Sequence, residues 1–173
     1  MTGPSHIVED DQAATSLQLD SYLPYRLSVA SNAVSGLIAR AYEDRFALSV
    51  PQWRLMCVLA EDGGLTQREI VARTVMDKVT VSRAARGLAG RRLIARSENE
   101  SDGRSHVLTL TDGGRRLHAE IAPLALAYEA ALICGLAPAE VAQLKRLLAR
   151  LQHAAGTLAG GAAPLADPGL TGL

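Results

Sequence analysis

The stretch between residues 66 and 111 most constrains the fold, because its hydrophobic spacing changes from helical to strand-like in a fixed order. Its first helical segment opens on Thr66 and its second on Asp77, and both residue types commonly cap helices. In chain order the predicted elements are a helix over 66–73, a helix over 77–88, a strand over 93–97, a turn-rich loop over 98–104 and a strand over 106–111. The order predicts a helix-turn-helix followed by a β-hairpin.

Longer helices flank this stretch on both sides. Apolar residues recur at three and four positions over 22–45, and Ser49 and Gln52 form a capping box that opens a helix ending at Gly63. Two more helices are predicted from residues 112 and 138 onward. With 48% hydrophobic and only 3% aromatic residues, the composition favours helix packing. The predicted fold class is mainly α, with four helices, a hairpin wing and two further helices.

These elements give a predicted division of the chain. The segments are a flexible tail (1–19), a dimerisation helix (20–48), a winged-helix domain (49–112), dimerisation helices (113–155) and a second flexible tail (156–173). The flanking helices carry apolar stripes that a domain of this size cannot cover by itself. A partner surface is therefore needed, and a homodimer is expected to supply it. An intramolecular helical lid is the alternative.

Charge is unevenly distributed along the chain. The chain has 18 basic and 18 acidic residues and no net charge, but residues 66–106 hold nine Lys or Arg against five acids. The helix over 77–88 presents Lys78, Ser82, Arg83 and Arg86, and a helix of this kind fits the major groove of DNA. A solvated basic face on an ordinary helix pair would have the same residues. Arg104 in the hairpin supplies a second basic finger, suited to an adjacent minor groove.

The sequence resembles the MarR family of bacterial regulators over about residues 22–153. The matching stretches are 65–72, 77–83, 93–94, 102–104 and 108–113. The resemblance implies that the helix over 77–88 enters the major groove and that Arg104, steadied by Asp102, enters the minor groove. It also implies a homodimer in which the N- and C-terminal helices of the two chains intertwine. One departure is Arg92, which stands where the family usually has a helix-ending glycine, so the fourth helix is expected to end differently.

Besides the minor-groove contact of Arg104, the expected DNA contacts fall into two groups. Thr80, Ser82 and Arg83 are expected to contact bases, and Lys78, Arg86, Thr66 and Gln67 to contact phosphates. The full set of predicted DNA-binding residues is Thr66, Gln67, Lys78, Val79, Thr80, Ser82, Arg83, Arg86, Asp102 and Arg104. We expect a repressor that binds a pseudo-palindromic operator in double-stranded DNA.

A small-molecule effector is also expected. Arg26 lies near the apolar arc of the first helix, where its charge either pairs with an acid across the dimer or binds an anionic ligand. The segment 22–35 resembles that of MarR members that respond to hydroxycinnamates or their coenzyme A thioesters, which implies an aromatic carboxylate or acyl-CoA effector. The candidate effector residues are Tyr22, Arg26, Ser28, Asn32, Trp53, Met56 and His118. Residues such as Trp53, Met56 and His118 more often belong simply to the core than to a ligand site.

Other functions have less support in the sequence. It holds no nucleophile–base–acid set, phosphate-binding glycine loop or metal-ligand cluster, so we expect no enzyme activity, cofactor or metal. No long apolar run or signal segment is present, which predicts a cytoplasmic protein without membrane contact. The alternatives are a winged-helix protein-interaction module and a regulator that senses oxidants through Cys57 or Cys134.

Overall fold

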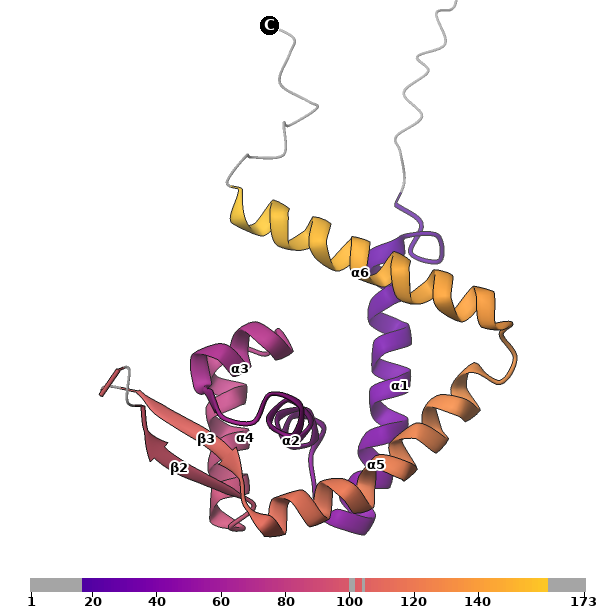
Figure 1. Cartoon of the computed structure of the whole chain (residues 1–173). Helices are drawn as coiled ribbons and strands as arrows, with labels where there is room; N and C mark the ends of the chain where they lie inside the picture. Colours follow the sequence, from indigo (N-terminus) through magenta and orange to yellow (C-terminus); the bar gives the residue numbers. More distant parts are fainter. Residues whose placement is uncertain (1–16, 100–101, 104, 162–173) are drawn as a thin grey trace, which may run out of the picture. The chain divides into compact units, whose positions relative to one another are not determined.

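The predicted helix-turn-helix and hairpin are present in the computed structural model, which describes residues 17–99, 102–103 and 105–161 (Figure 1). The chain forms two units that divide between His118 and Ala119. The first unit contains α1 (Leu23–Phe46), α2 (Val50–Asp62), β1 (Leu65–Thr66), α3 (Gln67–Thr74), α4 (Lys78–Gly90), β2 (Ile94–Glu98), β3 (His106–Leu110) and the start of α5 (Asp112–Ile133). The second contains the rest of α5 and α6 (Pro138–Gly160). The winged helix-turn-helix class is confirmed.

Local caps begin the helices where the sequence predicts. The hydroxyl of Ser49 accepts a hydrogen bond from the backbone N–H of Gln52 at 3.4 Å, and the Gln52 side chain accepts one from the backbone N–H of Ser49 at 2.9 Å. Thr66 and Glu69 make the same reciprocal pair at the start of α3. Because these bonds satisfy backbone donors that a helix leaves unpaired, they fix where each helix begins.

The turn between α3 and α4 is held from both sides. The hydroxyl of Thr74 donates to the carbonyl of Ile70 at 2.6 Å and accepts a hydrogen bond from the N–H of Met76 at 3.3 Å. Met76 is buried, whereas Val75 between them has a positive φ of 55°. Since a β-branched residue rarely adopts this left-handed conformation, the turn holds Val75 at a cost in backbone energy.

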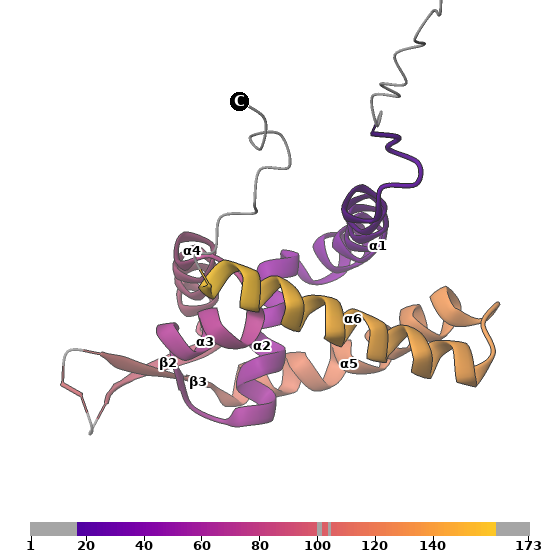
Figure 2. The ribbon, with the colours of Figure 1, turned by 90° about the horizontal axis from the view of Figure 1, so that it is seen from above.

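The sheet has three strands, one more than the sequence predicts. Its order is β1-β3-β2, all antiparallel, and β1 pairs Leu65 with Leu108 and Thr66 with Val107. β1 was missed because two residues show no period and form a strand only through pairing with β3. The β2–β3 hairpin is in the predicted place, and Figure 2 shows it projecting away from α2, α3 and α4.

The end of α4 explains the departure at Arg92. The helix ends at Gly90, Arg91 follows as its cap, and Arg92 adopts the left-handed conformation with a φ of 56°. Its backbone N–H donates to the carbonyl of Ala89 at 2.9 Å. Arg92 therefore occupies the left-handed conformation that a glycine would adopt with less strain, so the turn after α4 forms without a glycine at this position.

Apolar side chains from α2, α3, α4 and the sheet form one core in the first unit. The residues with the least exposure include Leu55, Leu59, Ile70, Val81, Leu88 and Leu108. α4 packs against both α2 and α3, so one face of the helix is buried and the opposite face is left to solvent. The core thereby fixes which side chains of α4 point outward.

The second unit is helical. Lys145 of α6 and Glu129 of α5 form an ion pair at 3.1 Å. α6 extends to Gly160, past residue 156, where the sequence analysis placed the start of a tail, because the Ala-rich stretch 154–159 continues the helix. The tail residues 162–173, and 1–16 at the other end, lie outside the described residues. No single described helix is long and apolar enough to cross a membrane; α5 and α6 pass that test only as a pair bent by 105°.

Candidate nucleic-acid interface

The outward face of α4 gathers most of the side chains that the sequence analysis assigned to DNA. Val81, Ala84, Ala85 and Leu88 are buried on the inner face. The residues that line a shallow hollow of about 350 Å³ on the outer face are Lys78, Val79, Ser82, Arg83 and Arg86. Three of these, Lys78, Arg83 and Arg86, are cations on one side of the helix, which gives a positively charged surface about one helix wide. Such a surface fits the groove of a polyanion such as double-stranded DNA.

Thr80 lies at the edge of this face and is half-buried. Its hydroxyl donates to the carboxylate of Asp77 at 2.6 Å, and its backbone N–H donates to the same carboxylate at 2.8 Å. These hydrogen bonds hold the pKa of Asp77 below its usual range, so the helix cap stays ionised. While this bond is made, the Thr80 hydroxyl can only accept a hydrogen bond from a base, and it cannot donate one to a phosphate.

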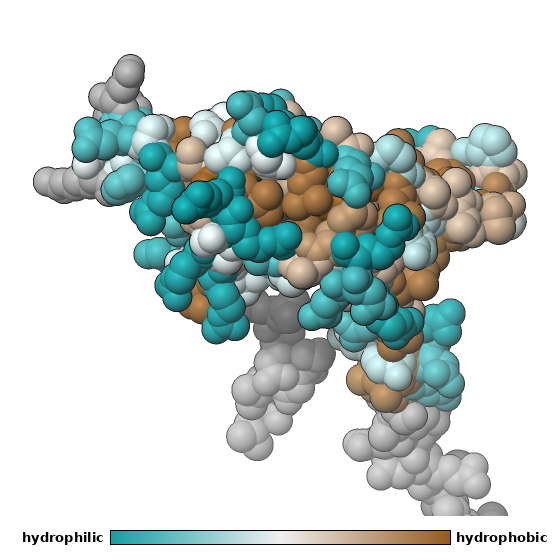
Figure 3. Space-filling model, turned by 90° about the horizontal axis from the view of Figure 1, so that it is seen from below, coloured by the Kyte–Doolittle hydropathy of each residue, from teal (hydrophilic) through white to brown (hydrophobic). Residues whose placement is uncertain are grey.

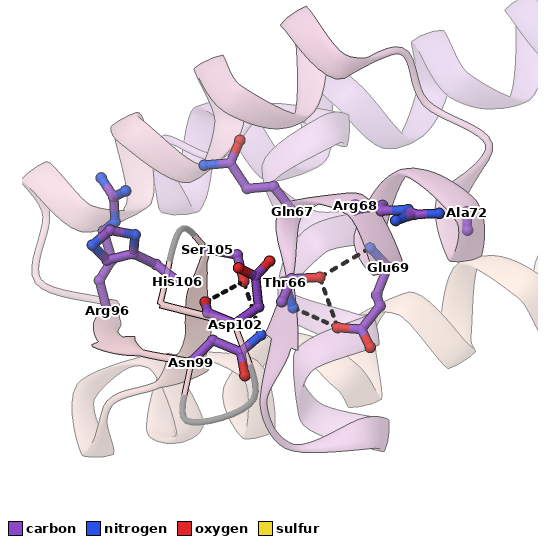
Figure 4. Close-up of a pocket in the computed structure, with 10 residues that line it drawn as sticks. All are labelled: Thr66, Gln67, Arg68, Glu69, Ala72, Arg96, Asn99, Asp102, Ser105 and His106. Carbon is purple, nitrogen blue, oxygen red and sulfur yellow. Dashed lines mark hydrogen bonds between the residues drawn. The ribbon is translucent and has the colours of Figure 1, made fainter.

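A groove of about 570 Å³ lies between the start of α3 and the hairpin (Figure 4). It is lined by Thr66, Gln67, Arg68, Glu69, Ala72, Arg96, Asn99, Asp102, Ser105 and His106. Two predicted phosphate contacts, Thr66 and Gln67, are therefore together on one wall. The backbone N–H of Thr66 donates to the Glu69 carboxylate at 2.7 Å, and the Thr66 hydroxyl donates to it at 2.8 Å. These two bonds keep the pKa of Glu69 low and engage the hydroxyl within the helix cap.

Three basic groove residues had no role in the sequence analysis. Arg68, Arg96 and His106 are all exposed. Because Glu98 pairs with His106 and Arg96 with Leu108, Arg96 and His106 lie on the same face of the hairpin as diagonal neighbours. The alternation of side chains along a strand predicts from sequence that Arg96 and Glu98 share one face. It does not predict that His106 lies on that face, because the pairing of the two strands depends on the length of the loop.

Two of the nine basic residues counted in this region bind within the protein instead. Arg73 pairs with Asp62 at 2.8 Å and with Glu61 at 3.2 Å, which lowers the pKa of Asp62. The guanidinium of Arg91 donates to the carbonyls of Ala47 at 2.8 Å and Phe46 at 2.9 Å, where α1 ends. Arg73 joins α3 to α2, and Arg91 joins the end of α4 to the end of α1. Fewer basic side chains are therefore available to a ligand than the nine that the sequence holds between residues 66 and 106.

The described part of the hairpin loop is closed by short-range hydrogen bonds. Asn99 donates from its side chain to the Ser105 hydroxyl at 2.8 Å, and the N–H of Ser105 donates to the carbonyl of Asp102 at 2.9 Å. Asp102 is exposed beside the groove. Arg104, the predicted minor-groove residue, lies outside the described residues.

The candidate effector residues do not form one group. Met56 is fully buried and belongs to the core, as its apolar helix position allowed. Tyr22, Arg26, Ser28 and Asn32 are exposed on or beside α1, so within the described chain the charge of Arg26 is not buried against the apolar arc. Trp53 and His118 do meet, with stacked rings whose centroids are 5.1 Å apart. Tyr42 packs edge-on against Trp53 at 5.4 Å.

His118 also faces a hollow of about 500 Å³ between the end of α2, β3 and the start of α5. The lining residues are Leu59, Ala60, Gly63, Gly64, Thr109, Leu110, Arg115 and His118. The guanidinium of Arg115 pairs with Asp112 at 2.7 Å and donates to the carbonyl of Leu110 at 2.6 Å. The cation in this hollow is therefore already partnered.

The stability of the fold is expected to fall as the pH drops below about 6.5, the usual pKa of histidine. Burial lowers the pKa of His118, an effect that nearby Glu61 opposes in part. The unfolded chain then binds a proton at His118 more readily than the folded chain. Stability is therefore lost as the pH falls from the pKa of His118 in the unfolded chain to its lower pKa in the folded chain. Denaturation followed by fluorescence of Trp53, the only tryptophan, at several pH values measures this. His118→Gln should flatten this part of the pH dependence; an unchanged profile would contradict the assignment.

The cysteine environments do not favour redox sensing at Cys57. Burial, with a smaller contribution from Glu61, raises the pKa of the Cys57 thiol to about 12. Because the thiolate is the form that reacts with oxidants, a thiol held protonated is inert near neutral pH. Cys134 is exposed in the second unit.

Comparisons with known proteins agree with this geometry. A model of the MarR family matches residues 48–105, which span the helix-turn-helix, β2 and the hairpin loop and end just before β3. The HTH-type transcriptional regulator TtmR of Methylorubrum extorquens is 32% identical over 102 residues, or 57% of this chain. That match spans only 50% of the length of TtmR.

Solved structures match over more of their length. A MarR family transcriptional regulator from Silicibacter pomeroyi is 30% identical with a TM-score of 0.69, over 78% of this chain and 89% of that one. Bordetella bronchiseptica BpsR, whose DNA binding is regulated by 6-hydroxynicotinic acid, is 25% identical with a TM-score of 0.71, over 80% of this chain and 98% of that one. The similarity thus extends beyond the winged-helix domain.

Proposed function

The chain belongs to the MarR family, and we propose that it regulates transcription by binding a specific operator in double-stranded DNA. The observation that carries the proposal is the outer face of α4, where Lys78, Arg83 and Arg86 stand exposed over a buried inner face. A convex cationic helix beside a projecting hairpin matches the shape and charge of a major groove next to a minor groove. Binding to the chromosome would place this function in the cytoplasm.

Each part of the interface has a proposed role. Ser82 and Arg83 contact base edges, with Thr80 as an acceptor at the margin. Lys78, Arg86 and Gln67 contact phosphates, and Thr66 does so when its hydroxyl exchanges the bond to Glu69 for one to a phosphate. Asp102 steadies Arg104, which enters the minor groove. Arg68, Arg96 and His106, which line the groove beside Gln67, are additional candidates for phosphate contact.

We further propose that the active form is a homodimer. α6 exposes Leu144, Leu147, Leu148 and Leu151 at helical spacing, and α1 exposes Leu23, Leu27 and Val34. Fully burying one such side chain is worth about 1.5–3 kcal/mol, so a second copy that covers these stripes would stabilise both chains. Two-fold symmetry would set the two α4 helices about 34 Å apart, one turn of DNA, and requires a pseudo-palindromic operator.

The proposed mode of regulation is repression that a small aromatic acid or aromatic acyl-CoA relieves. BpsR supports this class of effector, since 6-hydroxynicotinic acid is itself an aromatic acid. An effector that prefers a DNA-incompetent form of the dimer by about 1–3 kcal/mol would weaken operator binding about 5- to 150-fold. Tyr22, Arg26, Ser28, Asn32, Trp53 and His118 remain the candidates for contact with it.

A gel-shift assay on fragments of the source genome, including the protein's own promoter, tests this function. We expect a few fragments to be retained at protein concentrations that leave random DNA of equal length free. Addition of aromatic acids or their acyl-CoA thioesters to the retained complexes should release the DNA with one class of compound. Equal retention of all fragments would contradict a specific operator, and retention that no such compound reverses would contradict the proposed effector class.

A further inference from the structure

The winged-helix part of the chain leaves two valines exposed. Between Leu48 and His118, Val75 and Val79 are the only large apolar side chains exposed in the described residues, with 71% and 65% of their surface accessible. The large apolar side chains of α1 and α6 that stay exposed have a ready explanation in dimerisation, but these two lie elsewhere. Hydrophilic residues (teal) otherwise dominate the hairpin end of the first unit in Figure 3. The two valines are exceptions on a polar surface.

Both valines lie at the N-terminal end of α4. Val79 is in the first turn of the helix and lines the same hollow as Lys78, Arg83 and Arg86. Val75 comes two residues before the cap Asp77, in a turn whose neighbouring residues are fixed by the Thr74 hydrogen bonds. In helix-turn-helix proteins the N-terminal residues of the second helix are the ones that contact base edges.

The conformation of Val75 adds an independent argument. Its φ of 55° strains a β-branched residue, and glycine or asparagine would adopt this angle more easily. Strain of this kind commonly accompanies a functional side chain. Because the Val75 side chain is exposed and its backbone is strained, it adds no stability to the protein in the absence of DNA.

We propose that Val75 and Val79 contact the methyl groups of thymines in the operator, and so determine part of its sequence. The thymine C5-methyl is the apolar group that the major groove displays on base edges. Lys78 and Arg86 on the same face would hold phosphates, and the valines would be buried only against a correctly placed thymine. This inference rests on the proposed operator binding.

Uracil in place of thymine tests the proposal, because it removes the methyl group and leaves base pairing intact. The probe is an operator fragment retained in the genomic gel shift, synthesised once with thymine and once with uracil throughout. Loss of one buried carbon should weaken wild-type binding about fourfold for each contacted methyl. Single uracil substitutions should locate the effect at one or two thymines in each half-site.

Two variants separate methyl contact from other effects. Val79→Ala should reduce the thymine-to-uracil affinity ratio toward one. Val75→Gly should do the same while raising the melting temperature by about 2–4 °C, because it relieves the strained φ, so misfolding cannot explain its loss of discrimination. Lys78→Ala is the matched control on the same turn and should weaken both probes equally.

The outcomes distinguish this inference from the proposed function. If a fragment binds specifically but the thymine and uracil forms bind alike, the methyl contact is wrong and the operator function stands. An affinity ratio that stays at the wild-type value in a valine variant overturns the role of that valine. If no fragment binds specifically, the proposed function fails, and this inference fails with it.

Discussion

Replacing Arg83 with alanine is expected to lower operator affinity about 5- to 150-fold, equivalent to about 1–3 kcal/mol. Arg83 is exposed on the outer α4 face and makes no side-chain hydrogen bond or ion pair within the part of the chain that the structure describes. Its guanidinium is therefore available for a bidentate contact with guanine, which no smaller side chain can replace. Random DNA should lose less affinity, so specificity falls as well.

Lys78→Ala is the control for Arg83→Ala. Lys78 is equally exposed but is assigned to a phosphate, so its loss should weaken operator and random DNA alike and reduce the salt dependence of binding. Fluorescence anisotropy with labelled duplexes gives both affinities for each variant. Equal losses on operator and random DNA for Arg83→Ala would remove it from base recognition.

The largest expected effect on stability is that of Gly114→Ala, a loss of about 3 kcal/mol in the free energy of unfolding. A Cβ at Gly114 would overlap the carbonyl oxygen of Leu93 and lie 3.1 Å from the carbonyl carbon of that residue. Since the obstacle is backbone, it cannot rotate away. The N–H of Gly114 donates to Thr111 at 3.1 Å, which also keeps α5 from shifting.

Gly113→Ala is the matched control for this substitution. A Cβ at Gly113 would lie 3.6 Å from the Thr111 hydroxyl, an ordinary contact, and alanine suits a helix better than glycine. We expect its stability to equal or exceed that of the wild type by up to about 1 kcal/mol. Urea denaturation at one fixed protein concentration compares the three proteins, because the proposed dimerisation would make stability depend on concentration. Equal midpoints for both variants would contradict the close approach of α5 to Leu93.

Much of the fold could be predicted because its signals are local. The caps at Ser49, Thr66 and Asp77 act within one turn of helix, so sequence spacing alone predicts where α2, α3 and α4 begin. β1 could not be predicted, since its two residues become a strand only by pairing with β3, which lies about forty residues later in the chain. The left-handed conformation of Arg92 likewise depends on how β2 continues from α4.

In the candidate site, too, the features set by local periodicity could be predicted, and those set by tertiary contacts could not. Helical periodicity assigns Lys78, Arg83 and Arg86 to the outer face of α4, because the apolar residues between them define the inner one. The partners of Arg73 and Arg91 depend on tertiary contacts with α2 and α1, and no local pattern reveals them. Met56 shows the same limit, since an apolar residue on a helix suits a core and a ligand pocket equally.

The salt dependence of operator binding tests the central claim most directly. If Lys78 and Arg86 of two subunits each neutralise a phosphate, the logarithm of the binding constant should fall against the logarithm of salt concentration with a slope of about −4 or steeper. Over the same range the operator should stay more tightly bound than random DNA of equal length. A slope near zero, or equal binding of operator and random DNA at every salt concentration, would contradict a sequence-specific DNA-binding role for α4.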